Sequence, residues 1–212
     1  MIAIVDYGMG NLRSVQKGLE RAGFPAELTS DPAAVRNATG LVLPGVGAFK
    51  KAMESLEALG LVGAITSFIE SGRPFLGICL GLQLLFTEGE EFGIQKGLGV
   101  FPGRVIRFPF GDPGAPENPA GLKVPHMGWN GVDIRKETWA LRGIEEGTHF
   151  YFVHSYYPVP KDPKIISTTT EYGGEFASSI AQGNLFASQF HPEKSQAAGL
   201  TILGNFGRRV QG

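Results

Sequence analysis

Residues 74–83 read PFLGICLGLQ, where an apolar run meets the single cysteine of the chain, Cys79. The run at 74–78 predicts a buried strand, and the spacing of apolar residues at 80–86 predicts a helix directly after it. Strands that are apolar on both sides are typical of parallel sheets that carry helices on both faces. This stretch therefore indicates an α/β fold.

The same alternation runs through the first 90 residues. Strand-like runs lie at 2–5 and 40–43, with a weaker one at 26–29, and helical spacing is found at 11–22 and 61–70. A regular alternation of strands and helices is typical of doubly wound α/β proteins. We therefore expect an open, mostly parallel sheet flanked by helices.

The second half of the chain has a different pattern. Residues 109–121 contain four prolines and three glycines, which predicts a loop. Strand-like runs then lie at 132–135, 148–159, 164–172, 175–182 and 184–190. The last two runs predict a hairpin around Gly183, and a helix is expected at 196–209. The simplest arrangement is one domain, residues 1–212, with a mixed sheet.

The composition excludes several classes of protein. Among 212 residues 19 are Lys or Arg and 20 are Asp or Glu, a net charge of 19 − 20 = −1, so neither nucleic acid nor a membrane surface is expected as a partner. No basic segment precedes the first apolar run and no apolar stretch reaches the length of a membrane span, which predicts a cytoplasmic protein without a signal peptide. One cysteine permits no intrachain disulfide, and no metal-binding spacing occurs, so neither a metal nor a cofactor is expected.

Cys79 stands between Gly77 and Gly81 in the pattern Gly-x-nucleophile-x-Gly, which places a nucleophile on a sharp strand-to-helix turn. Glycine is needed on both sides because such a turn is strained and its neighbours leave no room for a Cβ atom. A lone cysteine is more often a buried structural residue. The elbow pattern, in its strand–helix context, favours a nucleophile instead.

A cysteine nucleophile requires a base, and the base requires a group that orients it. Among four histidines, His191 follows the last strand-like run, at the sheet edge where the catalytic groups of open α/β proteins gather. Glu193 projects to the same side in an extended segment. The sequence thus predicts a triad of Cys79, His191 and Glu193. Without the elbow, His191 would fit an ordinary loop histidine better.

A second glycine-rich loop, PGVG at 44–47, follows the strand predicted at 40–43. Its backbone N–H groups, together with that of Leu80, could form an oxyanion hole, which stabilises negative charge on the attacked carbonyl oxygen. Taken alone, this loop fits a plain strand-to-helix turn better.

These motifs resemble those of the triad-type, or class I, glutamine amidotransferases. They are most similar to the glutaminase subunits of imidazole glycerol phosphate synthase, an enzyme of histidine biosynthesis. The resemblance extends over essentially the whole chain and implies a flavodoxin-like class I architecture. It is carried by DYGMGNL at 6–12, PGVG at 44–47, GICLGLQ at 77–83, PHMGWN at 125–130, HSYY at 154–157 and QFHPEKS at 189–195.

The resemblance implies a reaction. Cys79 would attack the side-chain amide of glutamine, and backbone N–H groups near Val46 and Leu80 would hold the oxyanion. His191, oriented by Glu193, would protonate the departing ammonia and later activate water. The residues that the resemblance places at the glutamine-binding site are Gly45, Gly47 and Gln83.

The resemblance also implies a partner. In this family the ammonia passes to a TIM-barrel cyclase subunit, with which the glutaminase forms a heterodimer. The residues placed at or near that interface are His126, Met127, Trp129, Asn130 and Lys194. An exposed Trp–Met pair is a reasonable contact surface, although on sequence alone both residues could equally belong to the core.

Two alternatives stay open. The same triad would serve a glutaminase of another synthase or a stand-alone γ-glutamyl hydrolase, and only the segments DYGMGNL and MGWN distinguish these. A binding module without activity could share the fold, since fold does not fix function. The presence of the cysteine, the histidine and the glutamate argues against that second alternative.

Overall fold

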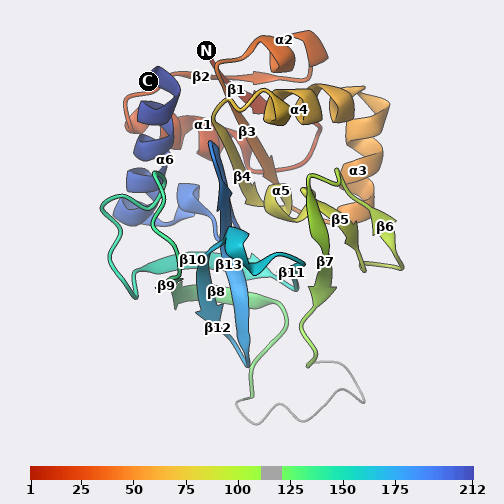
Figure 1. The fold of residues 1–212 in the computed structure, drawn as a ribbon, viewed down its shortest axis with the longest axis vertical. Helices are drawn as coiled ribbons and strands as arrows, with labels where there is room; N and C mark the ends of the chain where they lie inside the picture. The colour runs from red at the N-terminus through yellow and green to blue at the C-terminus, as the bar shows by residue number, and fades with distance from the viewer. Residues whose placement is uncertain (111–120) are drawn as a thin grey trace.

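The computed structural model describes residues 1–110 and 121–212. In this part of the chain eight strands form the main sheet (Figure 1). Across the sheet they are β2 (Ala26–Thr29), β1 (Ile2–Val5), β3 (Gly40–Gly45), β4 (Phe75–Cys79), β14 (Leu185–Ser188), β13 (Glu175–Gln182), β12 (Ile166–Glu171) and β9 (Asp133–Ile134). Neighbours from β2 to β14 pair in parallel, and those from β14 to β9 pair antiparallel. The expected α/β fold with a mixed sheet is confirmed.

Helices cover both faces of the parallel half (Figure 1). One face carries α1 (Leu12–Arg21) and α6 (Gln196–Gln211), on the left of the view. The other carries α2 (Pro32–Asn37), α3 (Phe49–Ala58) and α4 (Leu61–Glu70). The short strand β1 shows why two layers of helices are needed. Its side chains alternate, so that Ile2 and Ile4 join the core under α1 and α6, whereas Ala3 and Val5 join the core under α3 and α4.

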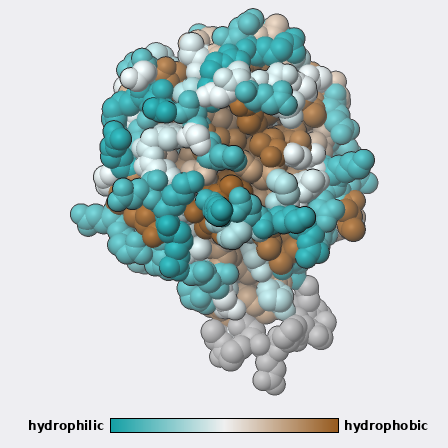
Figure 2. Space-filling model, in the orientation of Figure 1, coloured by the Kyte–Doolittle hydropathy of each residue, from teal (hydrophilic) through white to brown (hydrophobic). Residues whose placement is uncertain are grey.

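Two smaller sheets lie beside the antiparallel half. One orders its strands as β11 (Tyr156–Pro160), β7 (Phe101–Arg107), β5 (Phe86–Gly89) and β6 (Gln95–Lys96). The other pairs β8 (His126–Gly131) with β10 (His149–His154). The short helices are α5 (Leu80–Gln83), η1 (Pro163–Ile165) and η2 (Pro192–Lys194). Figure 2 shows apolar surface gathered in a hollow of the viewed face. Below α4, a cavity of about 230 Å³ is lined in part by Ile69, Phe75 and Leu185.

The structure corrects two expectations. The helix predicted at 80–86 ends after Gln83, because Phe86 already pairs with Phe101 in the parallel contact of β5 with β7. The run at 148–159 is two strands rather than one, since the chain leaves the pairing with β8 at His154 and then pairs with β7 from Tyr156. Of the loop predicted at 109–121, residues 111–120 lie outside the described residues.

Within the described ranges, no single helix has the length and hydropathy of a membrane span. The bent pair α3 and α4 passes that test only when both helices are taken together.

Candidate active site

Cys79 is the last residue of β4 and sits on a strained turn. Its backbone has φ +54° and ψ −107°, a conformation that non-glycine residues rarely adopt. The flanking glycines are required by close contacts. A Cβ atom on Gly77 would lie 2.8 Å from the Cβ of Ala187, and one on Gly81 would overlap the carbonyl oxygen of Leu43. The predicted elbow therefore exists, and it presents the sulfur at the carboxyl edge of the parallel strands.

The loop that follows β3 reaches the same edge. Gly45 is the register partner of Cys79 in the pairing of β3 with β4. A Cβ atom on Gly45 would lie 2.8 Å from that of Leu80 and would overlap the hydroxyl of Tyr7, which donates a hydrogen bond to the carbonyl of Pro44 at 2.9 Å. The backbone of this loop thus lies against the elbow and against Tyr7, and only glycine fits at position 45.

The last two residues of the loop are the accessible ones. Val46 is 38% exposed, and Gly47 has φ +97°, which glycine adopts without strain. Leu80, the first residue of α5, is buried. The residues predicted for the oxyanion hole, Val46 on the loop after β3 and Leu80 at the start of α5, therefore lie on two segments that meet at this edge.

His191 and Glu193 come together at the start of the short helix η2, which His191 directly precedes. Nδ1 of His191 lies 2.8 Å from Oε1 of Glu193, and both side chains are almost completely buried. The hydroxyl of Ser195 fixes the loop, since it donates to the carbonyl of His191 at 2.7 Å and accepts from the N–H of Tyr151 at 3.0 Å. Nε2 of His191 has no hydrogen-bond partner among the described residues. The ring is held at one nitrogen and leaves the other unused.

The thiol and the imidazole interact electrostatically. Burial lowers the pKa of His191, but the charge of the nearby Cys79 and the hydrogen bond to Glu193 raise that pKa to about 10. Burial, and to a smaller extent the charge of Cys79, raises the pKa of Tyr7. A protonated His191 therefore faces the sulfur, while Tyr7 stays a neutral donor.

Gln83 lies inside the protein and is 6% exposed. Its Nε2 donates to the carbonyl of Tyr156 at 2.9 Å and to Oε1 of Gln189 at 3.1 Å. Both N–H groups of the amide are therefore used internally, and only its Oε1 is left for a substrate.

The residues predicted for the partner surface separate onto two faces of the β8–β10 sheet, because side chains alternate along a strand. Met127 (62% exposed) and Trp129 (47% exposed) lie on the outer face. The Trp129 ring makes an edge contact with the ring of Tyr151, and the ammonium of Lys194 lies over the Tyr151 ring, 5.6 Å from its centroid. His126 is buried and Asn130 is half-buried, so these two residues lie behind the exposed pair.

Sequence reasoning missed two residues of the site. Tyr7 is buried against Gly45, and Gln189 donates from Nε2 to Sγ of Cys79 at 3.6 Å. Both occur within the segments DYGMGNL and QFHPEKS, so their positions carried a signal. Their contacts depend on three-dimensional packing and could not be read from spacing.

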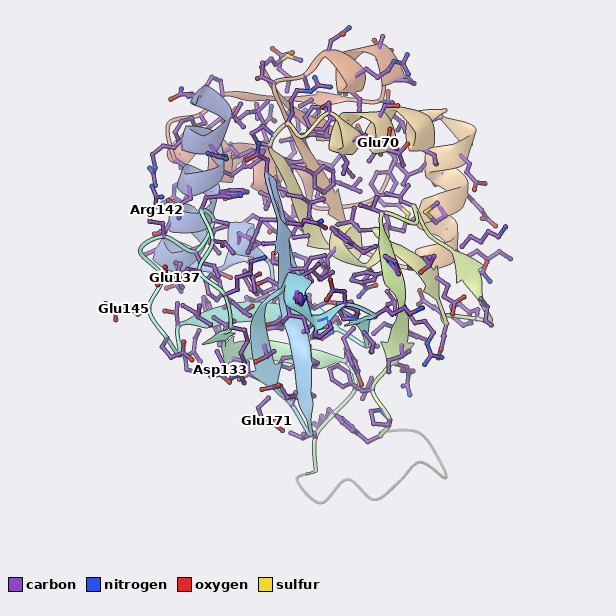
Figure 3. The ribbon with its side chains drawn as sticks, viewed as in Figure 1. Glu70, Asp133, Glu137, Arg142, Glu145 and Glu171 are labelled. Atoms are coloured by element: carbon purple, nitrogen blue, oxygen red, sulfur yellow. The ribbon has the colours of Figure 1, made fainter. Side chains whose placement is uncertain are left out.

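Other cavities lie apart from the sulfur. One of about 800 Å³ is lined by residues of 134–146, among them Glu137 and Arg142, which project at the outer edge of the molecule (Figure 3). A cavity of about 510 Å³ lies between α1 and η2 and is lined in part by Lys17 and Glu193. Within the described ranges, no group of three or more His, Cys, Asp or Glu residues could hold a metal ion.

The fold and the site have the form expected of a glutamine amidotransferase, and the family model described as "Glutamine amidotransferase class-I" matches residues 3–210. Two curated relatives, each named "Imidazole glycerol phosphate synthase subunit HisH", are similar over nearly the whole chain. The one from Syntrophotalea carbinolica is 58% identical and the match covers 98% of this chain and 99% of the relative. The one from Geobacter sulfurreducens is 55% identical and the match covers 97% of each. The chain belongs to the class I glutamine amidotransferase family and, within it, to the family of imidazole glycerol phosphate synthase subunit HisH.

Solved structures agree on the fold. A crystal structure described as a glutamine amidotransferase superposes with a TM-score of 0.72 over 100% of both chains, at 19% identity. The glutaminase domain of Trypanosoma brucei CTPS gives a TM-score of 0.70 over 99% of this chain and 93% of the other, at 16% identity. At this identity the likeness shows the architecture alone.

Proposed function

We propose that this chain is the glutaminase subunit of imidazole glycerol phosphate synthase, which hydrolyses glutamine to glutamate and ammonia and passes the ammonia to a cyclase. The observation that carries the proposal is the buried His191–Glu193 pair, which stands beside a cysteine on a strained elbow. That arrangement has the parts that nucleophilic catalysis by a thiol requires: nucleophile, base and orienting acid.

The first half of the reaction forms a thioester. The thiolate of Cys79 attacks the side-chain amide carbon of glutamine, and the carbonyl electrons move onto oxygen. Backbone N–H groups of Val46 and Leu80 stabilise that oxyanion. The intermediate collapses, the C–N bond breaks, and protonated His191 gives its proton to the departing nitrogen. Ammonia and a γ-glutamyl thioester on Cys79 are the products.

The second half restores the enzyme. His191, now neutral, takes a proton from water, and the resulting hydroxide attacks the thioester carbon. The C–S bond breaks, the sulfur leaves as the thiolate, and glutamate is released. Glu193 holds the imidazole through Nδ1 during both steps and stabilises its charged form. The sum is glutamine plus water to glutamate plus ammonia.

The substrate would lie along the loop at 44–47. Gly45 lets the backbone of this loop lie against the elbow, and Gly47 holds a positive φ that exposes the next stretch of backbone beside the sulfur. Gln83 contributes only its Oε1, because its N–H groups are bonded internally. That oxygen is an acceptor suited to the α-ammonium group of glutamine.

The proposed partner is the TIM-barrel cyclase subunit, bound as a heterodimer. The outer face of the β8–β10 sheet supports this choice, since Met127 and Trp129 expose apolar surface there and Lys194 adds a charge. Ammonia released into water would mostly be protonated and lost as a nucleophile, so a docked acceptor is chemically required. Met127 and Trp129 would touch the partner, whereas His126 and Asn130 would support them from behind.

Residues 1–212 act as one domain. The protein works in the cytoplasm, because a thiol nucleophile must remain reduced and cytoplasmic thiols are kept so.

The test is glutamate release from glutamine by three preparations: the chain alone, the chain with the cyclase barrel, and both with the nucleotide ligand of the barrel. We expect release only in the third, because Gly45 and Gly47 permit a peptide flip at Val46 that the partner would induce. Equal release in all three would keep the glutaminase but favour a stand-alone hydrolase. Release in none would leave a binding module without activity.

A further inference from the structure

A continuous line of hydrogen bonds begins on the interior face of β8. Nδ2 of Asn130 lies 3.3 Å from Nε2 of His126, and Nδ1 of His126 lies 3.0 Å from Nε2 of His154. Nδ1 of His154 then lies 2.9 Å from the carbonyl oxygen of Tyr156. The two histidines are buried, at 3% and 6% exposure. The line thus crosses the core behind the outer face that carries Trp129.

The same line continues to the nucleophile. The carbonyl of Tyr156 also accepts from Nε2 of Gln83 at 2.9 Å, and that Nε2 donates to Oε1 of Gln189 at 3.1 Å. Nε2 of Gln189 donates to Sγ of Cys79 at 3.6 Å. Gln189 is fully buried, so no water competes for these bonds.

Only one assignment of donor and acceptor atoms satisfies every hydrogen bond along this line. Asn130 must point its NH₂ toward His126, because its Oδ1 accepts from the N–H of Gly131 and its Nδ2 donates to the carbonyl of Glu171. His126 therefore accepts at Nε2 and donates from Nδ1, and His154 does the same toward the carbonyl of Tyr156. From the other end, a carbonyl can only accept, which fixes the amides of Gln83 and Gln189.

Both histidines are neutral, as this assignment requires. Burial lowers the pKa of His126 to about 4. Burial is also the main cause that lowers the pKa of His154 to about 3, against an opposing hydrogen bond to the carbonyl of Tyr156. Loss of any member would leave a buried donor or acceptor unpaired, which is costly, so the members hold one another in place.

We propose that Gln189 is a positioning residue for the nucleophile, and that the line Asn130–His126–His154–Tyr156–Gln83 connects its amide to the partner-facing strand β8. An N–H donor aimed at sulfur stabilises the thiolate over the thiol and holds the sulfur at the elbow. A partner that presses on Trp129 moves the strand on which Asn130 and His126 sit. The connection to the partner rests on the proposed function, whereas the role of Gln189 at the sulfur does not.

The test uses the fact that Cys79 is the only cysteine of the chain. Its rate of alkylation by iodoacetamide, measured across pH on the full-length chain, reports the thiolate without glutamine and without a partner. In Gln189→Leu we expect the rate at neutral pH to fall about tenfold and the midpoint of the profile to move to higher pH, because one hydrogen bond to a charged group is lost. Gln189→Glu keeps the size but removes the donor and adds charge, and should move the midpoint further.

The matched control is Gln16→Leu. Like Gln189→Leu, it removes one hydrogen bond donated by the amide Nε2 and one accepted by Oε1: Gln16 on α1 donates to the carbonyl of Ala26 at 2.8 Å and accepts from Arg13 at 3.0 Å. This variant should leave the alkylation profile unchanged. Thermal unfolding of each variant verifies that it is folded. A wild-type profile in both folded Gln189 variants would overturn the role of Gln189. So would an equal shift in Gln16→Leu.

The proposed connection between Gln189 and β8 is tested by a separate measurement. Binding of the cyclase barrel should change the alkylation profile of the wild type, and the change should be lost in His126→Leu. An unchanged wild-type profile, or a full change in His126→Leu, would overturn the connection. Because alkylation needs no turnover, these outcomes are independent of whether the chain releases glutamate.

Discussion

Nδ1 of His191 lies 2.8 Å from Oε1 of Glu193, in side chains that are 2% and 1% exposed. The two residues are separated only by Pro192, which begins the turn η2 and folds one toward the other. Oε2 of Glu193 has no hydrogen-bond partner among the described residues, so the carboxylate acts on the ring alone. A buried carboxylate held against one ring nitrogen fixes the tautomer and keeps Nε2 available for proton transfer.

The first prediction concerns pH. Because the pKa of His191 rises from 6.5 to about 10 on folding, protonated His191 stabilises the folded state fully below pH 6.5. That contribution is lost as the pH rises through about 10. Urea unfolding of the wild type and of His191→Asn should therefore show a gap in the free energy of unfolding that is larger near pH 6 than at pH 9.5. A gap that stays constant, or widens with pH, would contradict the assignment.

The second prediction separates glutamine hydrolysis from ammonia use. Cys79→Ala removes the nucleophile, so glutamine-dependent synthesis by the complex should fall by about a thousandfold or more. Synthesis from added ammonium salt should persist, since the cyclase then receives ammonia directly. Steady-state rates with either nitrogen source measure both. Near wild-type glutaminase activity in this variant would remove Cys79 from the mechanism.

A third prediction concerns the glycine after the elbow. Gly81→Ala drives a Cβ atom into the carbonyl of Leu43 and should lower the free energy of unfolding by about 1–3 kcal/mol or more. Gly63→Ala on α4 meets no atom within 4 Å and should raise it by about 0.5–1 kcal/mol. Urea midpoints of the two variants are compared. If the two substitutions changed the free energy of unfolding equally, the elbow would not be closely packed.

The fourth prediction addresses the partner surface. Trp129→Ala should weaken binding of the cyclase barrel by about thirtyfold, as expected of an aromatic anchor at an interface. It should leave the fold intact, because the side chain is 47% exposed. Phe92→Ala is the control, since Phe92 is 82% exposed on the β5–β6 connection. Calorimetric titration measures both; equal losses, or none for Trp129→Ala, would place the interface elsewhere.

The strands of the parallel half, and the antiparallel hairpin of β13 with β14, could be predicted from the sequence because their signals are local. β1 and β3 are short apolar runs, the hairpin turns at Gly183, and α1, α4 and α6 show regular helical spacing. No sequence prediction covers the helices α2 and α3. The error at 84–86 has a tertiary cause. Phe86 continues a helical spacing, but its pairing with Phe101 is a long-range contact that no local pattern reports.

The candidate site likewise contains residues that local motifs predict and residues that they do not. Cys79, with its two glycines, and the His191–Glu193 pair lie within short motifs, so spacing alone brings each together. Gln189, His154 and Tyr7 reach the site through packing between distant segments, and nothing in the spacing indicates their hydrogen bonds. His126 shows the limit most clearly. It neighbours the exposed Met127 in sequence, but strand alternation directs it into the core.

The central claim is that glutamine hydrolysis passes through a thioester on Cys79. The most direct measurement is mass spectrometry of the chain after rapid acid quenching of the complex during turnover with glutamine. We predict a fraction of the chain that is heavier by one γ-glutamyl group, located by peptide mapping at Cys79 and absent from Cys79→Ala. An active complex with no such adduct, or an adduct on another residue, would contradict the account.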